Sequence, residues 1–273
     1  MTRWLDIPRV SDLLRLFRTA AFWLAGPLDW MGRSVRGKPD LPPLWLRRHT
    51  GAVSRFESAA QEMTALLDSL GVLNETDTVL DVGCGAGAMT AALARRLGPH
   101  GRYVGFDVHA PSIRWCRKRY GNDPRLSFEI APIASPYGHR SGRTATSYRF
   151  PIEDAGAGFI LAKSVFTHLL EPEARHYLCE IRRTLRSGKA AVVTAFLFDA
   201  RPPGRRAAGV AFPFGDERVR QRSAGRPTAA VAYERSVFEG MVRDSGLSVV
   251  WMSPGFFPGA ERPGGQDILV LGH

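Results

Sequence analysis

The sequence predicts an α/β fold with a largely parallel sheet and helices on both faces. Two observations support this. Between residues 52 and 273, short apolar runs that suit buried strands alternate with stretches of helical periodicity. The first of these runs ends in a glycine-rich turn and passes directly into a helical pattern. The chain has 273 residues, enough for one large α/β domain or for one domain with an appendage.

The glycine-rich turn lies in residues 78–87, which read Thr-Val-Leu-Asp-Val-Gly-Cys-Gly-Ala-Gly. Glycines at alternate positions let the backbone turn sharply and approach a ligand closely. The helical pattern of residues 89–97 follows, so free backbone N–H groups lie at a helix N-terminus. The spacing is G-x-G-x-G, although Ala88 also leaves the G-x-G-x-x-A pattern of dinucleotide folds open. No Gly-Lys-Ser/Thr of a P-loop is present.

Residues 1–50 differ in character from the rest and predict an amphipathic helical arm, leaving residues 51–273 as the main domain. Leu, Phe, Trp and Ala dominate residues 10–30, but the longest uncharged run, 19–28, is too short to span a bilayer. No cleavage site of a signal peptide follows. The arm could cover the core as a lid, pack as extra helices, or lie on a membrane surface. Residues 37–43, rich in proline, form a linker.

The remaining elements follow in order from their periodicity and their stop signals. The predicted helices are 54–70, 89–97, one beginning near Pro111, 171–186 and 233–245. The predicted strands are 78–82, 102–107, 126–130, 158–162, 190–196, 247–252 and 267–271. Residues 199–228, rich in arginine, glycine and proline, are expected either to cover a substrate or to form a flexible surface loop.

Asp107 ends the second predicted strand. A carboxylate there can accept both ribose hydroxyls of an adenosyl group, because it has two acceptor oxygens. The alternative is that Asp107 only caps the next helix.

Two segments resemble class I S-adenosylmethionine-dependent methyltransferases. Asp81 and the glycines that follow match motif I of that family, and residues 163–170 (Lys-Ser-Val-Phe-Thr-His-Leu-Leu) resemble a subfamily that reads S-V-F-T-H after strand four. The resemblance covers roughly residues 52–273. It implies a Rossmann-like seven-stranded sheet with an antiparallel final hairpin, and S-adenosyl-L-methionine as the cofactor. The cofactor-binding residues that it implies are Asp81, Gly83, Cys84, Gly85, Gly87, Asp107, Val108, Ile130, Ala131, Lys163 and Ser164.

The sequence departs from the family pattern at two places. The acid that often follows the third strand is missing, because the chain continues Ala131-Pro132. Gly158 stands where an aspartate usually begins the fourth strand. Contacts to adenine are therefore expected from backbone or from another side chain.

Methyl transfer is an in-line displacement that depends mainly on positioning, and a hydroxyl acceptor also needs a base. His168 is the candidate base, because the unperturbed pKa of histidine suits work near neutrality. The alternative is that His168 only packs or caps a helix start. Tyr137, His139 and His176 are weaker candidates. No metal site is expected, since histidines and carboxylates do not occur at ligand spacing.

The formal net charge is +11 and the pI is about 10.3. Such charge suggests attraction to nucleic acid, anionic membrane or an acidic substrate. With four lysines, 33 of the 37 basic residues are arginine and are scattered, which equally suits a compositional bias. The three cysteines, Cys84, Cys116 and Cys179, form no C-x-x-C pair, so neither zinc nor a disulfide framework is indicated. A reducing, cytoplasmic location is expected, with peripheral membrane contact through the arm as an option.

The sequence therefore predicts a methyltransferase that acts on a small-molecule or a lipid- or sugar-linked acceptor. An RNA methyltransferase is the first alternative, although no Asn/Asp-Pro-Pro-Tyr/Phe motif follows strand four. A scaffold that binds cofactor without catalysis is the second, motivated by the missing acids. A nicotinamide enzyme is the last.

Overall fold

A computed structural model describes residues 25–38, 41–47, 56–138, 142–199, 212–255 and 265–273. The chain divides into two compact units, Met1–Ser58 and Ala59–His273. The larger unit contains the sheet, and the smaller one contains two of the described helices.

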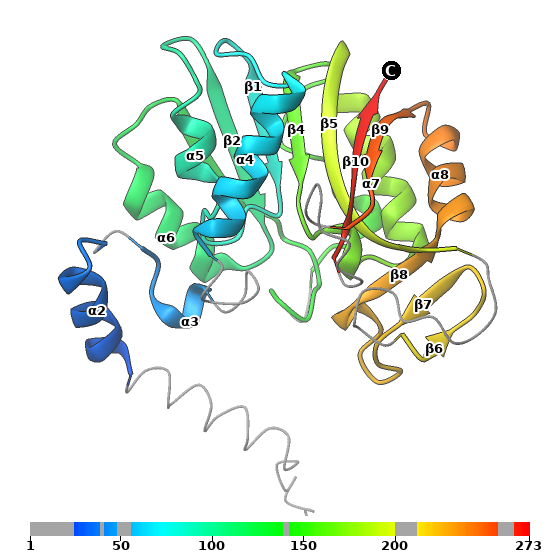
Figure 1. The fold of residues 1–273 in the computed structure, drawn as a ribbon, viewed down its shortest axis with the longest axis horizontal. Coiled ribbons are helices and arrows are strands. Elements are labelled where there is room, and N and C mark those ends of the chain that lie inside the picture. The colour runs from blue at the N-terminus through cyan, green and yellow to red at the C-terminus, as the bar shows by residue number, and fades with distance from the viewer. Residues whose placement is uncertain (1–24, 39–40, 48–55, 139–141, 200–211, 256–264) are drawn as a thin grey trace, which may run out of the picture. The chain divides into compact units, whose positions relative to one another are not determined.

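Five parallel strands form the centre of the sheet in the order β3-β2-β1-β4-β5 (Figure 1). Their bounds are Thr78–Val82 (β1), Arg102–Asp107 (β2), Leu126–Ile130 (β3), Ala157–Ala162 (β4) and Leu185–Phe198 (β5). β10 (Asp267–Gly272) pairs antiparallel with β5, and β9 (Ser248–Ser253) pairs antiparallel with β10. The expected parallel sheet with an antiparallel final hairpin is thus confirmed.

Three short strands, which the sequence analysis did not expect, extend this sheet. They are β6 (Phe214–Gly215), β7 (Val219–Gln221) and β8 (Val231–Glu234). β8 runs parallel to the carboxyl end of β5, and β7 pairs antiparallel with β8. The described part of the 199–228 insertion is therefore attached to the sheet. Tyr233, which was expected to begin a helix, lies in β8 instead, where it pairs with Leu197 of β5 and Val219 of β7 and its side chain is buried in the core.

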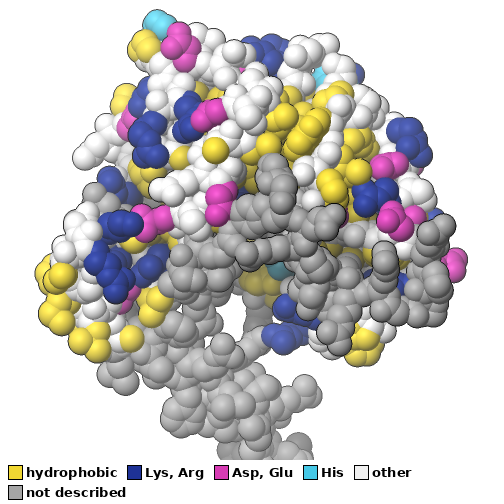
Figure 2. All heavy atoms as spheres, in the orientation of Figure 1, with side chains coloured by type: hydrophobic (Ala, Val, Ile, Leu, Met, Phe, Trp, Pro, Cys, Tyr) yellow, Lys and Arg dark blue, Asp and Glu magenta, His cyan; other side chains and the backbone are white. Residues whose placement is uncertain are grey.

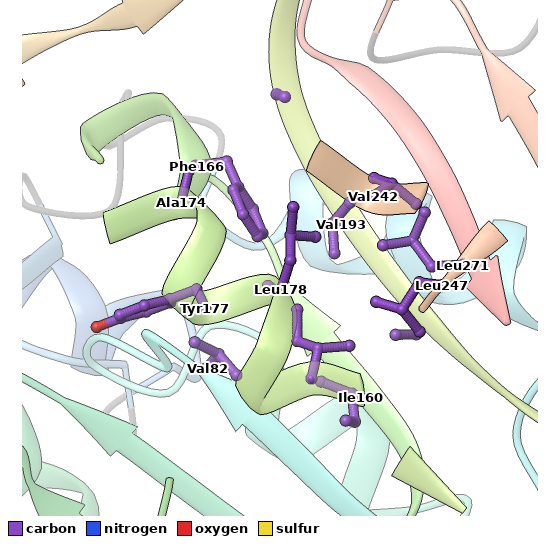
Figure 3. Packing of buried hydrophobic residues seen from close by; sticks show 14 of the residues in the cluster. Val82, Ile160, Phe166, Ala174, Tyr177, Leu178, Val193, Val242, Leu247 and Leu271 are labelled. Carbon is purple, nitrogen blue, oxygen red and sulfur yellow. The ribbon is translucent and has the colours of Figure 1, made fainter. Parts of the chain in front are cut away.

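Helices cover both faces of the sheet, as predicted (Figure 1). One face packs on α4 (Ser58–Leu70), α5 (Thr90–Ala94) and α6 (Ala110–Tyr120). The other packs on α7 (Glu171–Thr184) and α8 (Arg235–Asp244), where Leu178 and Val242 meet the strand residues Ile160 and Val193 (Figure 3). Strand residues alternate between the two cores, because successive side chains in a strand point to opposite faces. β5 begins earlier than predicted, directly after α7 ends at Thr184.

The structure gives a physical reason for Gly158 in place of the family's aspartate. A Cβ at this position would lie 2.1 Å from Oδ1 of Asp77, a buried carboxylate just before β1. Asp77 accepts hydrogen bonds from Nζ of Lys189 at 2.8 Å and from the backbone N–H of Asn74 at 2.9 Å. The carboxylate of Asp77 thus occupies the space that a side chain at position 158 would need.

The smaller unit contains α2 (Gly26–Val35) and α3 (Leu44–Arg47), which Asp29 links. Its carboxylate accepts hydrogen bonds from Nε of Arg33 at 3.0 Å, from the guanidinium of Arg47 and from the backbone N–H of Leu44 at 3.1 Å. Large apolar side chains of α2 are exposed on its surface (Figure 2): Leu28, Trp30, Met31 and Val35. Most of the predicted arm, residues 1–24, lies outside the described residues. No described helix has both the length and the hydropathy to cross a membrane.

Candidate functional site

The glycine turn after β1 is held against the neighbouring strand β2. The backbone N–H groups of Gly83 and Cys84 both donate to the carbonyl oxygen of Phe106, at 2.9 and 3.0 Å. Gly83, Gly85 and Gly87 have φ values of 69°, 54° and 79°, in the left-handed region that favours glycine. A Cβ at Gly83 would lie 2.8 Å from a methyl carbon of Val165. The turn therefore comes close to the segment that follows β4 only because this position lacks a side chain.

Asp107, at the end of β2, meets the same turn. Its Oδ2 accepts the backbone N–H of Gly85 at 2.8 Å, and its Oδ1 accepts the backbone N–H of His109 at 2.7 Å. The residue thus fixes the glycine turn against the segment that leads from β2 into α6. The N-cap of α6 is His109, and no side-chain capping hydrogen bond is found there among the described residues, so the structure does not give Asp107 the cap role; its ribose-binding role stays a prediction.

Asp81 is buried beneath the turn, 2% exposed. Its Oδ2 accepts the hydroxyl of Tyr103 at 2.6 Å, and this hydroxyl also lies 2.9 Å from Oγ1 of Thr90. Burial raises the pKa of the Asp81 carboxyl to about 7; the hydrogen bond from Tyr103 opposes the shift, the charge of Asp107 adds to it, and that of Lys163 opposes it. A cation brought close to the turn would favour ionisation of this acid.

The residues expected around an adenine lie on neighbouring strands. Ile130, the last residue of β3, is the register partner of Asp107 on β2. Ala131 is buried, and its backbone N–H donates to the carbonyl oxygen of Asp107 at 2.9 Å. Val108 follows β2 and packs against the α7 face of the core. The structure thus brings these three predicted residues to the same edge of the sheet as the glycine turn.

Lys163 and Ser164 leave the carboxyl end of β4 next to β1. Ser164 has φ 59°, a rare conformation for a residue with a Cβ. Its backbone N–H donates to Oγ1 of Thr194 at 2.7 Å, and its hydroxyl donates to Oε1 of Gln266 at 3.0 Å. The hydroxyl of Thr194 donates to the same Oε1 at 2.5 Å. Strained backbone of this kind persists where its surroundings fix it, and it clusters at functional sites.

His168 ends the short helical turn Phe166–His168 after β4. Its Nδ1 lies 2.9 Å from the carbonyl oxygen of Thr228 and 3.2 Å from the hydroxyl oxygen of Tyr137. A carbonyl oxygen can only accept, so Nδ1 carries the hydrogen and the neutral ring keeps its lone pair on Nε2. Burial lowers the pKa of His168, the hydrogen bond to Thr228 opposes this, and the charge of Arg222 adds to the lowering. The ring is therefore neutral near pH 7, with a basic nitrogen at Nε2.

Tyr233 of β8 holds the turn that carries His168. Its buried hydroxyl lies 2.6 Å from the carbonyl oxygen of Leu169 and 3.1 Å from that of Phe166. β8 thus fixes the position of the helical turn Phe166–His168 through the hydroxyl of Tyr233. Sequence reasoning missed Tyr233, Tyr103, Thr228 and Gln266, because each acts through a partner distant in sequence.

The weaker candidate His176 does not lie at this site. His176 contacts the carbonyl oxygen of Tyr148 through Nε2 at 2.8 Å on α7, and His139 lies outside the described residues. Burial raises the pKa of the Cys84 thiol well above its ordinary value, so this cysteine is a packing residue rather than a nucleophile. In the part of the chain that the structure describes, no group of three or more His, Cys, Asp or Glu residues could hold a metal ion.

Comparison with known proteins adds to this geometry. Residues 80–193 match a family model described as a methyltransferase domain. This match begins within β1 and ends within β5, so it includes the glycine turn, Asp107 and His168.

Two curated relatives match parts of the chain. An uncharacterized 37.1 kDa protein of a Streptomyces fradiae transposon is 27% identical over 149 residues, 49% of this chain and 39% of that protein. An uncharacterized methyltransferase of Mycobacterium tuberculosis is 47% identical over 60 residues, 22% of this chain and 28% of that protein. The matched stretches thus span well under half the length of either relative.

A solved structure shares the fold. The 1,6-didemethyltoxoflavin-N1-methyltransferase of Burkholderia thailandensis, solved with 1,6-didemethyltoxoflavin and S-adenosylhomocysteine bound, superposes with a TM-score of 0.52 at 16% identity. The superposition covers 99% of this chain and 92% of that one.

Proposed function

Since the chain carries a class I S-adenosylmethionine-dependent methyltransferase domain, we propose that it transfers a methyl group to a small-molecule or a lipid- or sugar-linked acceptor. The observation that carries this proposal is the convergence at one edge of the sheet. The glycine turn follows β1, Asp107 ends β2 and His168 follows β4; these three strands are neighbours in the sheet. Ligands of open parallel sheets bind outside the carboxyl ends of the strands.

The residues of the turn fit the cofactor. The carboxylate of Asp107 would accept the ribose hydroxyls, because it has two acceptor oxygens, and the glycine turn offers backbone with no side chain in the way. Ile130 and Ala131 would line the adenine, and Lys163 and Ser164 would lie toward the reacting end. When bound, S-adenosylmethionine supplies an electrophilic methyl group on a sulfonium sulfur.

His168 is the residue that we propose as general base. The carbonyl oxygen of Thr228 fixes the tautomer with hydrogen on Nδ1, which leaves Nε2 to accept a proton. In the described chain no hydrogen bond to Nε2 is found. A base at this position favours a hydroxyl acceptor, whose proton Nε2 would take as the oxygen attacks.

For the N-terminal arm we propose a role outside the chemistry, either as a lid or in contact with an anionic membrane. The exposed Trp30, Met31 and Val35 on α2 support an external partner, because large apolar side chains gathered on one helix favour burial. Deleting residues 1–36 should leave cofactor binding intact and reduce turnover or sedimentation with anionic vesicles. If the truncated protein matches the full chain in both respects, the arm has neither role.

The proposed function is tested by methyl transfer. The purified protein and S-adenosylmethionine labelled in the methyl group are incubated with fractions of a cell extract: small molecules, lipids and RNA. We expect label in the small-molecule or lipid fraction, and not with His168→Ala. Label only in RNA would favour the alternative substrate. Absence of transfer to every fraction, from folded protein that binds the cofactor, would support a non-catalytic scaffold.

A further inference from the structure

Four arginines lie in the described part of the insertion, and they differ in their partners. Nη2 of Arg218 pairs with Oε1 of Glu171 on α7 at 3.0 Å. The guanidinium carbon of Arg220 lies 4.6 Å from the ring centroid of Phe198. These two arginines attach the insertion to α7 and β5. Arg222 and Arg226 are exposed, and the described residues offer neither of them an ion pair or a side-chain hydrogen bond.

The backbone places both unpaired arginines beside the candidate base. The N–H of Arg222 donates to the carbonyl oxygen of Ala230 at 3.0 Å, which fixes the start of this loop. Arg226 precedes the short helical turn Pro227–Ala229, whose Thr228 carbonyl accepts the hydrogen bond from His168. Arg226 is thus two residues from the atom that orients the histidine. The loop between the two arginines closes on itself, with the N–H of Arg226 near the carbonyl oxygen of Ser223 at 3.4 Å.

Electrostatics agrees with this placement. Burial raises the pKa of the Tyr137 hydroxyl, and the charges of Arg222 and Arg226 act in the opposite direction. The charge of Arg222 also lowers the pKa of His168. Among the described residues, the charges that shift the pKa of these two groups are those of arginines. Two arginine charges thus act near the candidate base.

We propose that Arg222 and Arg226 form an anion subsite that binds a carboxylate or phosphate group of the methyl acceptor. This inference rests on the proposed function, since it specifies the class of acceptor for the same site. The planar guanidinium presents paired donors that match both anions in a bidentate manner. The subsite would position the acceptor's nucleophile near Nε2 of His168, which is the positioning that transfer requires. The positive charges of Arg222 and Arg226 would then bind the acceptor, whatever the cause of the arginine-rich composition.

The test uses the full chain saturated with S-adenosylhomocysteine. Inorganic phosphate, benzoate and the neutral benzyl alcohol are titrated in separate experiments at constant ionic strength, and binding is followed by NMR. The test variant is Arg222→Gln/Arg226→Gln. The matched control is Arg95→Gln/Arg186→Gln, which removes two exposed arginines at the opposite, amino-terminal edge of the sheet. Thermal unfolding shows that each variant is folded.

We expect phosphate or benzoate to bind the wild-type protein and the control alike, and the test variant at least tenfold more weakly. Benzyl alcohol should show no such difference. The preferred anion identifies the acceptor group. Equal binding of the anions to the test variant and the wild type would overturn the proposal, as would an equal loss in the control, which would indicate diffuse attraction. Affinity for S-adenosylhomocysteine should be unchanged in all variants. If the wild-type protein does not bind S-adenosylhomocysteine, the proposed function itself is refuted.

Discussion

Replacing Asp81 by asparagine should stabilise the cofactor-free protein increasingly as pH rises from 4 to 7. Asp81 is 2% exposed, and burial raises the pKa of its carboxyl from 3.8 to about 7. Asparagine has nearly the same shape, and its Oδ1 can still accept the hydroxyl of Tyr103, which lies 2.6 Å from Oδ2 of Asp81. The substitution thus removes the ionisable group and keeps its buried donor satisfied.

The sign follows from proton counting. Unfolded chains lose the Asp81 proton near pH 4, whereas the folded protein keeps it until about pH 7. Between these values the folded state binds more protons, so the free energy of unfolding falls as pH rises, and it levels off above pH 7. Each pKa unit corresponds to about 1.4 kcal/mol, which gives roughly 4 kcal/mol as an upper bound for a shift of about three units. The variant lacks this loss, so its advantage over the wild type should grow across the same window.

Urea unfolding of both proteins at pH 5, 6, 7 and 8, without cofactor, measures this difference. The change with pH is the informative quantity, because any fixed packing cost of asparagine cancels. We expect the difference in unfolding free energy to rise by about 1 kcal/mol or more per pH unit below pH 7 and then to level off. A difference that is flat or falls with pH would refute the assignment of a protonated, buried Asp81.

Three further outcomes follow from the structure. Asp107→Ala should weaken binding of S-adenosylhomocysteine by about 1.5–3 kcal/mol, roughly ten- to hundredfold, in a calorimetric titration; an unchanged affinity would exclude Asp107 from the cofactor site. His168→Ala should lower kcat by about 10²–10⁴-fold, and because the pKa of His168 is lowered, wild-type activity should fall with acid only below pH 6.5. A retained rate and the same acid limb in the variant would contradict a base role. Gly158→Ala should destabilise by about 1–3 kcal/mol in urea, because its Cβ would overlap Asp77. Gly240→Ala, in helix α8 with ordinary contacts, should be neutral or stabilising.

The central strands were predictable because each is a short apolar run bounded by turn signals. β1 through β4 lie within a residue of their expected bounds. The strand extension was not predictable, because β6 and β7 are held by pairing with residues elsewhere rather than by their own periodicity. Tyr233 is an example. The residues around it predict the start of a helix, but its hydroxyl donates to the carbonyl oxygens of Phe166 and Leu169, which are distant in sequence.

Parts of the candidate site were also predictable from the sequence, and other parts were not. The glycine turn and Asp107 were predictable, because steric and acceptor requirements confine the chemistry to particular residue types at fixed spacing. The environment of His168 was not, since its orientation depends on a backbone carbonyl of Thr228, which any residue could supply. A hydrogen bond to a backbone carbonyl cannot be predicted from the residue types in the sequence.

Calorimetric titration of the full chain with S-adenosylhomocysteine shows whether the turn after β1 binds an S-adenosyl cofactor. We expect saturable binding at one site per chain and no heat of binding from NAD in a parallel titration. Folded protein that takes up NAD, or that gives no heat with S-adenosylhomocysteine, would contradict this expectation.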